Sequence, residues 1–151
     1  MQIIKNKSAL TKLDKLLSFI IIFPLNRPMS RIITNTNIIV DDFDFAKSFP
    51  KDTFVHFLTH FHSDHYEGLS PLWNYGSIHC SHQTKKFIMN KYPKLQRVYS
   101  YDFNKKYTLE LLPRKFKVNF YLFDAKHIPG SSMILFQGPM GTIFFTGDFR
   151  Y

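Results

Sequence analysis

From residue 31 onward, short runs of hydrophobic residues alternate with polar and turn-forming positions. These runs are rich in Ile, Val, Phe and Tyr, the residues that favour β-strands. They predict strands at residues 38–40, 53–59, 77–80, 116–123, 133–137 and 142–146. Pro139-Met140-Gly141 is typical of a tight turn, so the last two strands are expected to form a hairpin.

Two segments have helical composition instead. Residues 81–92 predict a helix with Ser81 as its N-cap, and residues 64–73 predict a shorter one. Strands and helices in this mixed order place the chain in the α/β class.

Residues 1–28 follow a different pattern. A basic stretch leads into an apolar run at residues 16–25, which is far shorter than the roughly 20 residues that span a bilayer. No small-residue cleavage site of a signal peptide follows Leu25. We therefore expect no membrane partner and no secretion. Residues 1–28 are treated as an N-terminal extension of unassigned role, and residues 29–151 as one domain.

Composition narrows the classes of function. The 151 residues suit one domain, and a hydrophobic content of 44% excludes a disordered chain. With 20 Lys and Arg against 11 Asp and Glu, the formal charge is +9, which favours a polyanionic partner such as nucleic acid. The single cysteine, Cys80, excludes a cysteine-based zinc site, so histidines must supply the metal chemistry.

A dense group of metal-binding residue types follows the predicted strand 53–59. His60 and His62 are two positions apart, so an extended backbone turns both imidazoles to the same side. Asp64 and His65 come next and can address a second ion. Imidazole and carboxylate donors suit Zn²⁺, Mn²⁺ or Fe. The alternative is a chance grouping of polar residues, and four fixed positions at a strand end argue against it.

Two later residues can complete the site. His127 follows an apolar strand and precedes a Pro-Gly turn, while Asp148 follows Gly147 at the end of the last predicted strand. A carboxylate has two oxygens and can bridge two cations. Taken singly, His127 and Asp148 would be ordinary loop residues.

Three segments together carry a family resemblance. They are Phe57-Leu-Thr-His-Phe-His-Ser-Asp-His-Tyr66, Asp124-Ala-Lys-His-Ile-Pro-Gly-Ser-Ser132 and Gly141-Thr-Ile-Phe-Phe-Thr-Gly-Asp-Phe-Arg-Tyr151. In this order they resemble the DNA cross-link repair nucleases, which belong to the β-CASP group of the metallo-β-lactamase superfamily. The resemblance is strongest to the 5′ exonuclease branch of these nucleases. The resemblance implies an αββα sandwich with two divalent ions, Zn²⁺ being favoured over Mn²⁺, Mg²⁺ or Fe.

The resemblance also implies individual roles. His60, His62 and His127 would hold the first metal, Asp64 and His65 the second, and Asp148 would bridge the two. Asp64 and Asp148 would be the catalytic residues. Asp41 would support the ligands through hydrogen bonds without binding metal. His56, His79 and His82 match no ligand position and are interpreted as structural or surface residues.

The implied function is 5′-to-3′ DNA exonuclease activity in the nucleus, in repair of interstrand cross-links and double-strand breaks and at telomere ends. DNA 5′ ends, either single- or double-stranded, would be the partner. The chain would be the N-terminal half of the sandwich in a truncated enzyme, because the β-CASP insertion, a further metal-binding histidine and a 5′-phosphate pocket are missing. A sandwich without its second sheet would expose an apolar face. Lys126-His-Ile-Pro-Gly130 also departs from the family's usual Asn-His-Cys-Pro-Gly.

Two other functions fit the same motif. One keeps the metal site but acts on RNA 3′ ends or on a small ester or lactam. The other is an inactive DNA-binding module that merely retains the motif. A panel of nuclease substrates separates the first from DNA cleavage, and measured metal content separates the second.

Overall fold

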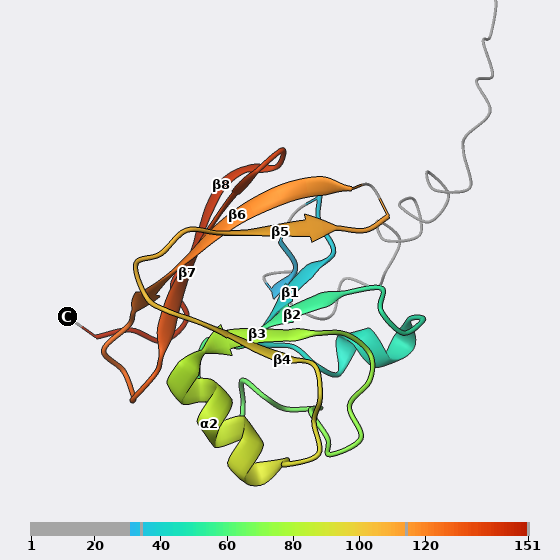
Figure 1. Cartoon of the computed structure of the whole chain (residues 1–151), viewed down its shortest axis with the longest axis vertical. Coiled ribbons are helices and arrows are strands. Elements are labelled where there is room, and N and C mark those ends of the chain that lie inside the picture. Colours follow the sequence, from blue (N-terminus) through green and yellow to red (C-terminus); the bar gives the residue numbers. More distant parts are fainter. Residues whose placement is uncertain (1–30, 34, 114, 151) are drawn as a thin grey trace, which may run out of the picture.

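A computed structural model describes residues 31–33, 35–113 and 115–150. Its eight strands form two sheets of four strands each, in the orders β1-β2-β3-β4 and β5-β6-β7-β8. The expectations for residues 1–28 lie outside the described residues. The mixed α/β class is confirmed, and two sheets stacked face to face, with a helix on one outer face, build three layers of the expected sandwich (Figure 1).

The first sheet is parallel. Its strands are β1 (Ile38–Val40), β2 (Val55–Phe57), β3 (Ile78–Ser81) and β4 (Val98–Tyr101). Parallel sheets are covered on both faces, which explains why β1 and β3 are buried along their whole length. A short 3-10 helix, η2 (Phe45–Ser48), follows β1.

Successive residues of each strand point to opposite faces of this sheet and so belong to two separate hydrophobic clusters. Ile39, Leu58 and Cys80 point to one side, where they pack with Ile88 of α2 (His82–Lys91). Ile38, Val40 and Phe57 point to the other side, toward the second sheet. Burial of Cys80 raises the pKa of its thiol to about 12, as expected for an unreactive cysteine of the core.

The second sheet is antiparallel and made of β5 (Tyr107–Leu111), β6 (Phe116–Asp124), β7 (Ser132–Gly138) and β8 (Gly141–Phe145). Strands β7 and β8 form the predicted hairpin, with Gly138 opposite Gly141 across the turn. The inner face contributes Val118, Phe120, Leu122, Ile134 and Phe136 to the core between the sheets.

Several sequence expectations are corrected here. The second sheet, which was expected to be missing, is present. Strands β4 and β5 and the short helix η2 were not predicted. Residues 64–73 form no helix but a series of turns, because Gly68 has a φ of 87° and Pro71 removes a backbone donor. Only isolated bonds remain there, such as the one from Leu69 N–H to Tyr66 carbonyl.

Candidate metal centre

The ligand candidates converge from three strand ends onto one edge of the sandwich. The histidine motif follows β2 of the first sheet, His127 lies between β6 and β7, and Asp148 follows β8. Backbone hydrogen bonds join these segments: Ser132 N–H donates to the Thr59 carbonyl at 2.9 Å, and Arg150 N–H donates to the Ala125 carbonyl at 2.8 Å. Residues 65 or more positions apart in the sequence therefore share one site.

Four of the six expected ligands form one tight group. His60, His62, His127 and Asp148 each offer a donor atom within 4.8 Å of the others. His62 Nδ1 lies 3.0 Å from His60 Nε2 and 3.2 Å from His127 Nε2. Two ligands of a tetrahedral zinc ion are about 3.3 Å apart when each bond is about 2.0 Å. The donor set and its spacing thus fit a divalent metal ion.

Asp148 also reaches the second pair of residues. Its Oδ2 atom is 3.8 Å from His60 Nε2, 3.6 Å from His127 Nε2 and 3.6 Å from His65 Nε2. His65 Nε2 is in turn 3.6 Å from Asp64 Oδ2. One carboxylate oxygen therefore faces both sets of candidate ligands, as a bridging role requires. Asp64 and His65 lie outside the tight group of four, so a second metal stays a prediction.

Asp41 is buried and braces two parts of the site. Its Oδ1 accepts a hydrogen bond from Thr59 N–H at 2.8 Å, and its Oδ2 lies 2.8 Å from His65 Nδ1. With Nδ1 occupied in this way, His65 directs Nε2 toward Asp148 and Asp64. Carboxylate-histidine pairs of this kind orient metal ligands in many proteins.

Thr59 is a residue that the sequence analysis missed. Its hydroxyl donates to Asp41 Oδ2 at 2.7 Å and lies 3.0 Å from His60 Nδ1. Because the single hydroxyl proton goes to the carboxylate, Thr59 Oγ1 must accept from His60 Nδ1–H. This leaves His60 Nε2 with a free electron pair facing the other ligands. Threonine is common in strands, so residue type alone gave no signal.

The electrostatics agree with this assignment. Burial, together with the neighbouring His65, lowers the pKa of His60 to about 4. His60 is therefore neutral near pH 7, as a metal ligand must be. Burial also opposes protonation of His65, but its hydrogen bond to Asp41 and the charges of Asp41, Asp64 and Asp148 outweigh burial and raise its pKa.

The remaining histidines have other roles. His79 is buried between rings, with Nδ1 2.7 Å from the Tyr101 hydroxyl and Nε2 2.9 Å from Ser77 Oγ. His82 is exposed and pairs with Asp102 at 3.2 Å. His56 is buried, and neither ring nitrogen has a hydrogen bond of ordinary geometry among the described residues.

Similar proteins were found by sequence and by structure, although no protein-family model matches the sequence. The 5′ exonuclease Apollo of Danio rerio is 38% identical over 125 residues, which cover 80% of this chain and 21% of Apollo. The DNA cross-link repair 1A protein of Homo sapiens is 38% identical over 124 residues, covering 82% of this chain and 11% of that protein. The chain thus spans a small part of the length of these relatives.

A metallo hydrolase from the archaeon Ignicoccus hospitalis has a similar structure. The two superpose with a TM-score of 0.56 at 14% sequence identity, over 78% of this chain and 55% of the archaeal chain. This likeness shows that the fold is that of a metallo-β-lactamase-type sandwich. Over most of its own length the chain is 31–38% identical to DNA cross-link repair proteins, so it is related in sequence to one part of each of these longer proteins.

Proposed function

We propose that this chain carries the metal centre of a nuclear 5′-to-3′ DNA exonuclease that repairs interstrand cross-links and double-strand breaks and processes telomere ends. The observation that carries the proposal is the convergence of three imidazoles and the Asp148 carboxylate on one point. The relatives named as a 5′ exonuclease and as cross-link repair proteins support DNA as the substrate.

The residues have separate parts in this chemistry. His60, His62, His127 and Asp148 would hold one divalent ion, and His65 and Asp64 would share Asp148 with a second. We propose Zn²⁺ for both. Bound metal lowers the pKa of coordinated water to about 7 and neutralises charge on phosphate oxygens. Thr59 and Asp41 hold the Nδ1 atoms of His60 and His65, which aims the Nε2 atom of each ring at the site, so these ligands need little rearrangement when metal arrives.

Cations next to the ligands suit a phosphate substrate. Lys126 and Arg150 are exposed and lie within two positions of His127 and Asp148. The whole chain has a formal charge of +9, so a polyanion is attracted to it. Among the described residues, no helix has the length and hydrophobicity of a membrane span.

Metal content and cleavage test the proposal together. We expect the purified protein, expressed at its natural length, to bind at least one zinc per chain and to degrade 5′-phosphorylated DNA. Asp148→Ala should abolish cleavage and reduce bound zinc, because the oxygen shared by both ligand sets is lost. DNA binding should be largely unchanged, since the variant removes a negative charge. Asp52→Ala, a change of the same kind on the exposed surface, should behave as wild type.

Three outcomes would contradict the proposal. Preference for RNA, or hydrolysis of a small ester or lactam alone, would favour the other metal-dependent reactions. Less than one bound ion per chain would favour a DNA-binding module without catalysis. Cleavage that survives Asp148→Ala would exclude the bridging role of this residue.

A further inference from the structure

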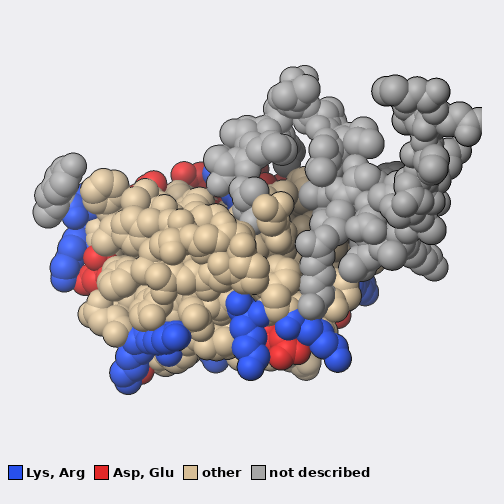
Figure 2. Space-filling view, turned by 90° about the horizontal axis from the view of Figure 1, so that it is seen from above, with Lys and Arg blue, Asp and Glu red and all other residues tan. Residues whose placement is uncertain are grey.

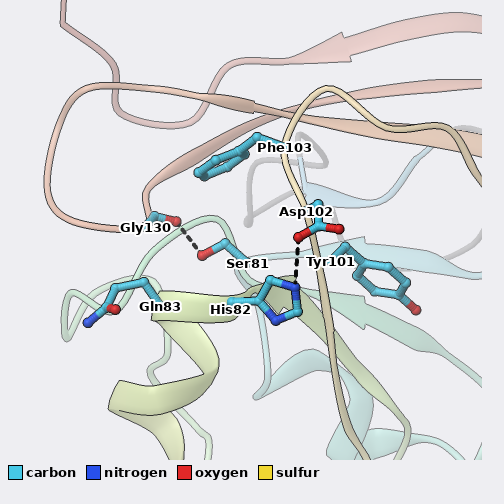
Figure 3. Close-up of a pocket in the computed structure, with 7 residues that line it drawn as sticks. All are labelled: Ser81, His82, Gln83, Tyr101, Asp102, Phe103 and Gly130. Atoms are coloured by element: carbon cyan, nitrogen blue, oxygen red, sulfur yellow. Dashed lines mark hydrogen bonds and ion pairs between the residues drawn. The ribbon is translucent and has the colours of Figure 1, made fainter.

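A groove runs from the candidate metal centre along the loop that carries His127. It consists of two adjoining cavities of about 320 and 240 Å³, and both are lined by Phe103 and Gly130. The larger cavity begins at His127 and Lys126. The smaller one continues to the start of α2, where it is lined by Ser81, His82, Gln83, Tyr101 and Asp102 (Figure 3). A chain-like molecule with one phosphate at the metal centre can therefore continue along this groove.

Phe103 stands where the two cavities meet and is held firmly. Its backbone forms a parallel bridge with Leu122 of β6, and the next residue, Asn104, donates its N–H to the Leu122 carbonyl at 2.8 Å. The Phe103 ring packs partly against the core between the sheets while it lines both cavities. A fixed aromatic ring of this kind is a platform on which any nucleic-acid base can stack.

The polar groups around Phe103 also suit a nucleotide. Gln83 offers an amide donor and acceptor at one end of the groove, and Lys126 offers an ammonium group at the other. Each of the two carboxylates of the groove is paired with a lysine, Asp102 with Lys105 at 2.7 Å and Asp124 with Lys126 at 2.7 Å. Asp102 also lies 3.2 Å from His82 Nε2. The groove therefore presents no uncompensated carboxylate to a phosphate.

The backbone at the start of α2 contributes little, because Ser81 already caps it. The Ser81 hydroxyl accepts from Thr84 N–H at 3.1 Å and donates to the Gly130 carbonyl at 2.6 Å. These bonds tie the helix to the wall of the groove and fix its width. Recognition must come from the side chains, Phe103 above all.

We propose that this groove binds a single-stranded DNA end, with the base beside the metal-centre phosphate stacked on Phe103 and its polar edge facing Gln83. The inference rests on the proposed function and adds the form of the substrate. The terminal base of a duplex has one free face, but base pairing occupies the polar edge that would face Gln83. The DNA end is therefore expected to enter the groove unpaired.

Binding can be measured apart from cleavage. The full chain, stripped of metal with EDTA, is titrated against a 5′-phosphorylated ten-residue thymidine oligonucleotide with a 3′ fluorophore, and anisotropy is recorded. Phe103→Leu keeps the apolar packing but removes the aromatic face, so we expect binding about tenfold weaker. Phe103→Trp should bind as tightly as wild type or more tightly. Phe144→Leu, the same change on a distant exposed face, should have no effect.

The outcomes separate the groove from the nuclease proposal. Failure of the wild type to bind the oligonucleotide, or equal binding by Phe103→Leu, would overturn the groove whether or not the protein cleaves DNA. Binding that depends on Phe103 without any cleavage by the zinc-loaded protein would leave the groove in place and contradict the nuclease. Thermal unfolding of each variant, followed by circular dichroism, verifies that a loss of affinity is not a loss of fold.

Discussion

At the scale of single residues, Thr59 connects the two halves of the candidate metal centre. Its hydroxyl lies between Asp41 and His60, and its carbonyl accepts two hydrogen bonds from Ser132, at 2.9 Å from N–H and 3.0 Å from Oγ. Its side chain also lies 3.2 Å from the place where Gly147 would carry a Cβ atom. Any larger residue at position 147 would push against Thr59, so Gly147 allows Asp148 to approach the histidines.

Thr59→Val tests this role because valine keeps the shape and removes the hydroxyl. The Nδ1 atom of His60 would lose its acceptor, and Asp41 would lose one donor. We expect zinc affinity to fall about 10- to 100-fold, the usual effect of losing a hydrogen-bond partner of a metal ligand. Competition with a chromophoric chelator measures it. Thr108→Val, an exposed threonine on β5, is the matched control, and equal affinities in both variants would contradict the role of Thr59.

His56 is a buried histidine whose two ring nitrogens have no hydrogen-bond partner among the described residues. It stacks on Phe43 at 5.2 Å between ring centroids and meets the edge of Trp73 at 5.0 Å. Burial lowers its pKa to about 4, against a small opposing effect of the Asp42 backbone. The unfolded chain takes up a proton at this residue near pH 6.5, whereas the folded chain does so only near pH 4. Its contribution to stability is therefore present above pH 6.5 and is lost as the pH falls toward 4.

His56→Phe should remove this acid sensitivity. Between pH 7.5 and pH 5, protonation of His56 in the unfolded chain should cost the wild type about 2 kcal/mol of unfolding free energy. The total loss over this pH range should therefore be about 2 kcal/mol smaller in the variant. Urea unfolding followed by circular dichroism measures the difference. The variant should also be about 1 kcal/mol more stable at pH 7.5, because it removes two buried nitrogens that have no hydrogen-bond partner among the described residues. His79 shifts in the same direction, so both proteins keep some pH dependence; parallel pH profiles would contradict the prediction.

At the scale of elements, the sequence predicted strands where hydrophobic residues run together and missed those with a mixed pattern. Strands β6 and β7 have long apolar runs and lie at the predicted positions. In β5, Thr108 and Glu110 face outward and dilute the signal. The false helix at residues 64–73 has helical spacing in its apolar residues, but turn geometry at Gly68 overrides it.

The residues of the candidate site were easier to single out from the sequence than the elements around them. Candidate metal ligands have characteristic residue types and spacing, which singled out His60, His62, His127 and Asp148, and the structure brings these four together. The sequence did not single out Thr59, which orients His60, or Phe103, which lines the groove. Threonine and phenylalanine are common in any β-sheet protein, so their residue type carries no signal. Their roles depend on contacts between segments far apart in the chain, which only the folded structure supplies.

The sequence predicted Ser81 as the N-cap of α2, and the helix begins directly after it, at His82. Ser81→Ala would remove the acceptor for Thr84 N–H and the donor to the Gly130 carbonyl. We expect a loss of about 1–2 kcal/mol in the free energy of unfolding, measured by urea denaturation. Ser100→Ala on β4, whose side chain has no such bonds to the described part of the chain, should cost much less. Similar losses in the two variants would mean that the cap contributes nothing specific.

At the scale of the whole molecule, the outer face of the second sheet has no layer upon it within the described residues. The inner residues of β6, β7 and β8 fill the core, so their neighbours point outward: Tyr121, Phe123, Met133, Leu135 and Phe144. Register brings these five together, with Leu135 paired to both Tyr121 and Phe144. Figure 2 shows a broad face without charged side chains, with Lys and Arg along its left and lower edges. An apolar face was expected, although the reason given for it, a missing sheet, was wrong.

Such a face should make this chain associate with itself, since contiguous apolar surface is removed from water on contact. The formal charge of +9 opposes association, and salt screens that repulsion. We therefore expect sedimentation velocity to show oligomers that increase with protein and salt concentration. Phe144→Lys places a charge on this face at its β8 edge, on a side chain that is 50% exposed, and should reduce the oligomers severalfold without lowering zinc content. Thr108→Lys adds the same charge outside the apolar group and should reduce them far less; an equal effect of both variants would mean that net charge, and not this face, controls association.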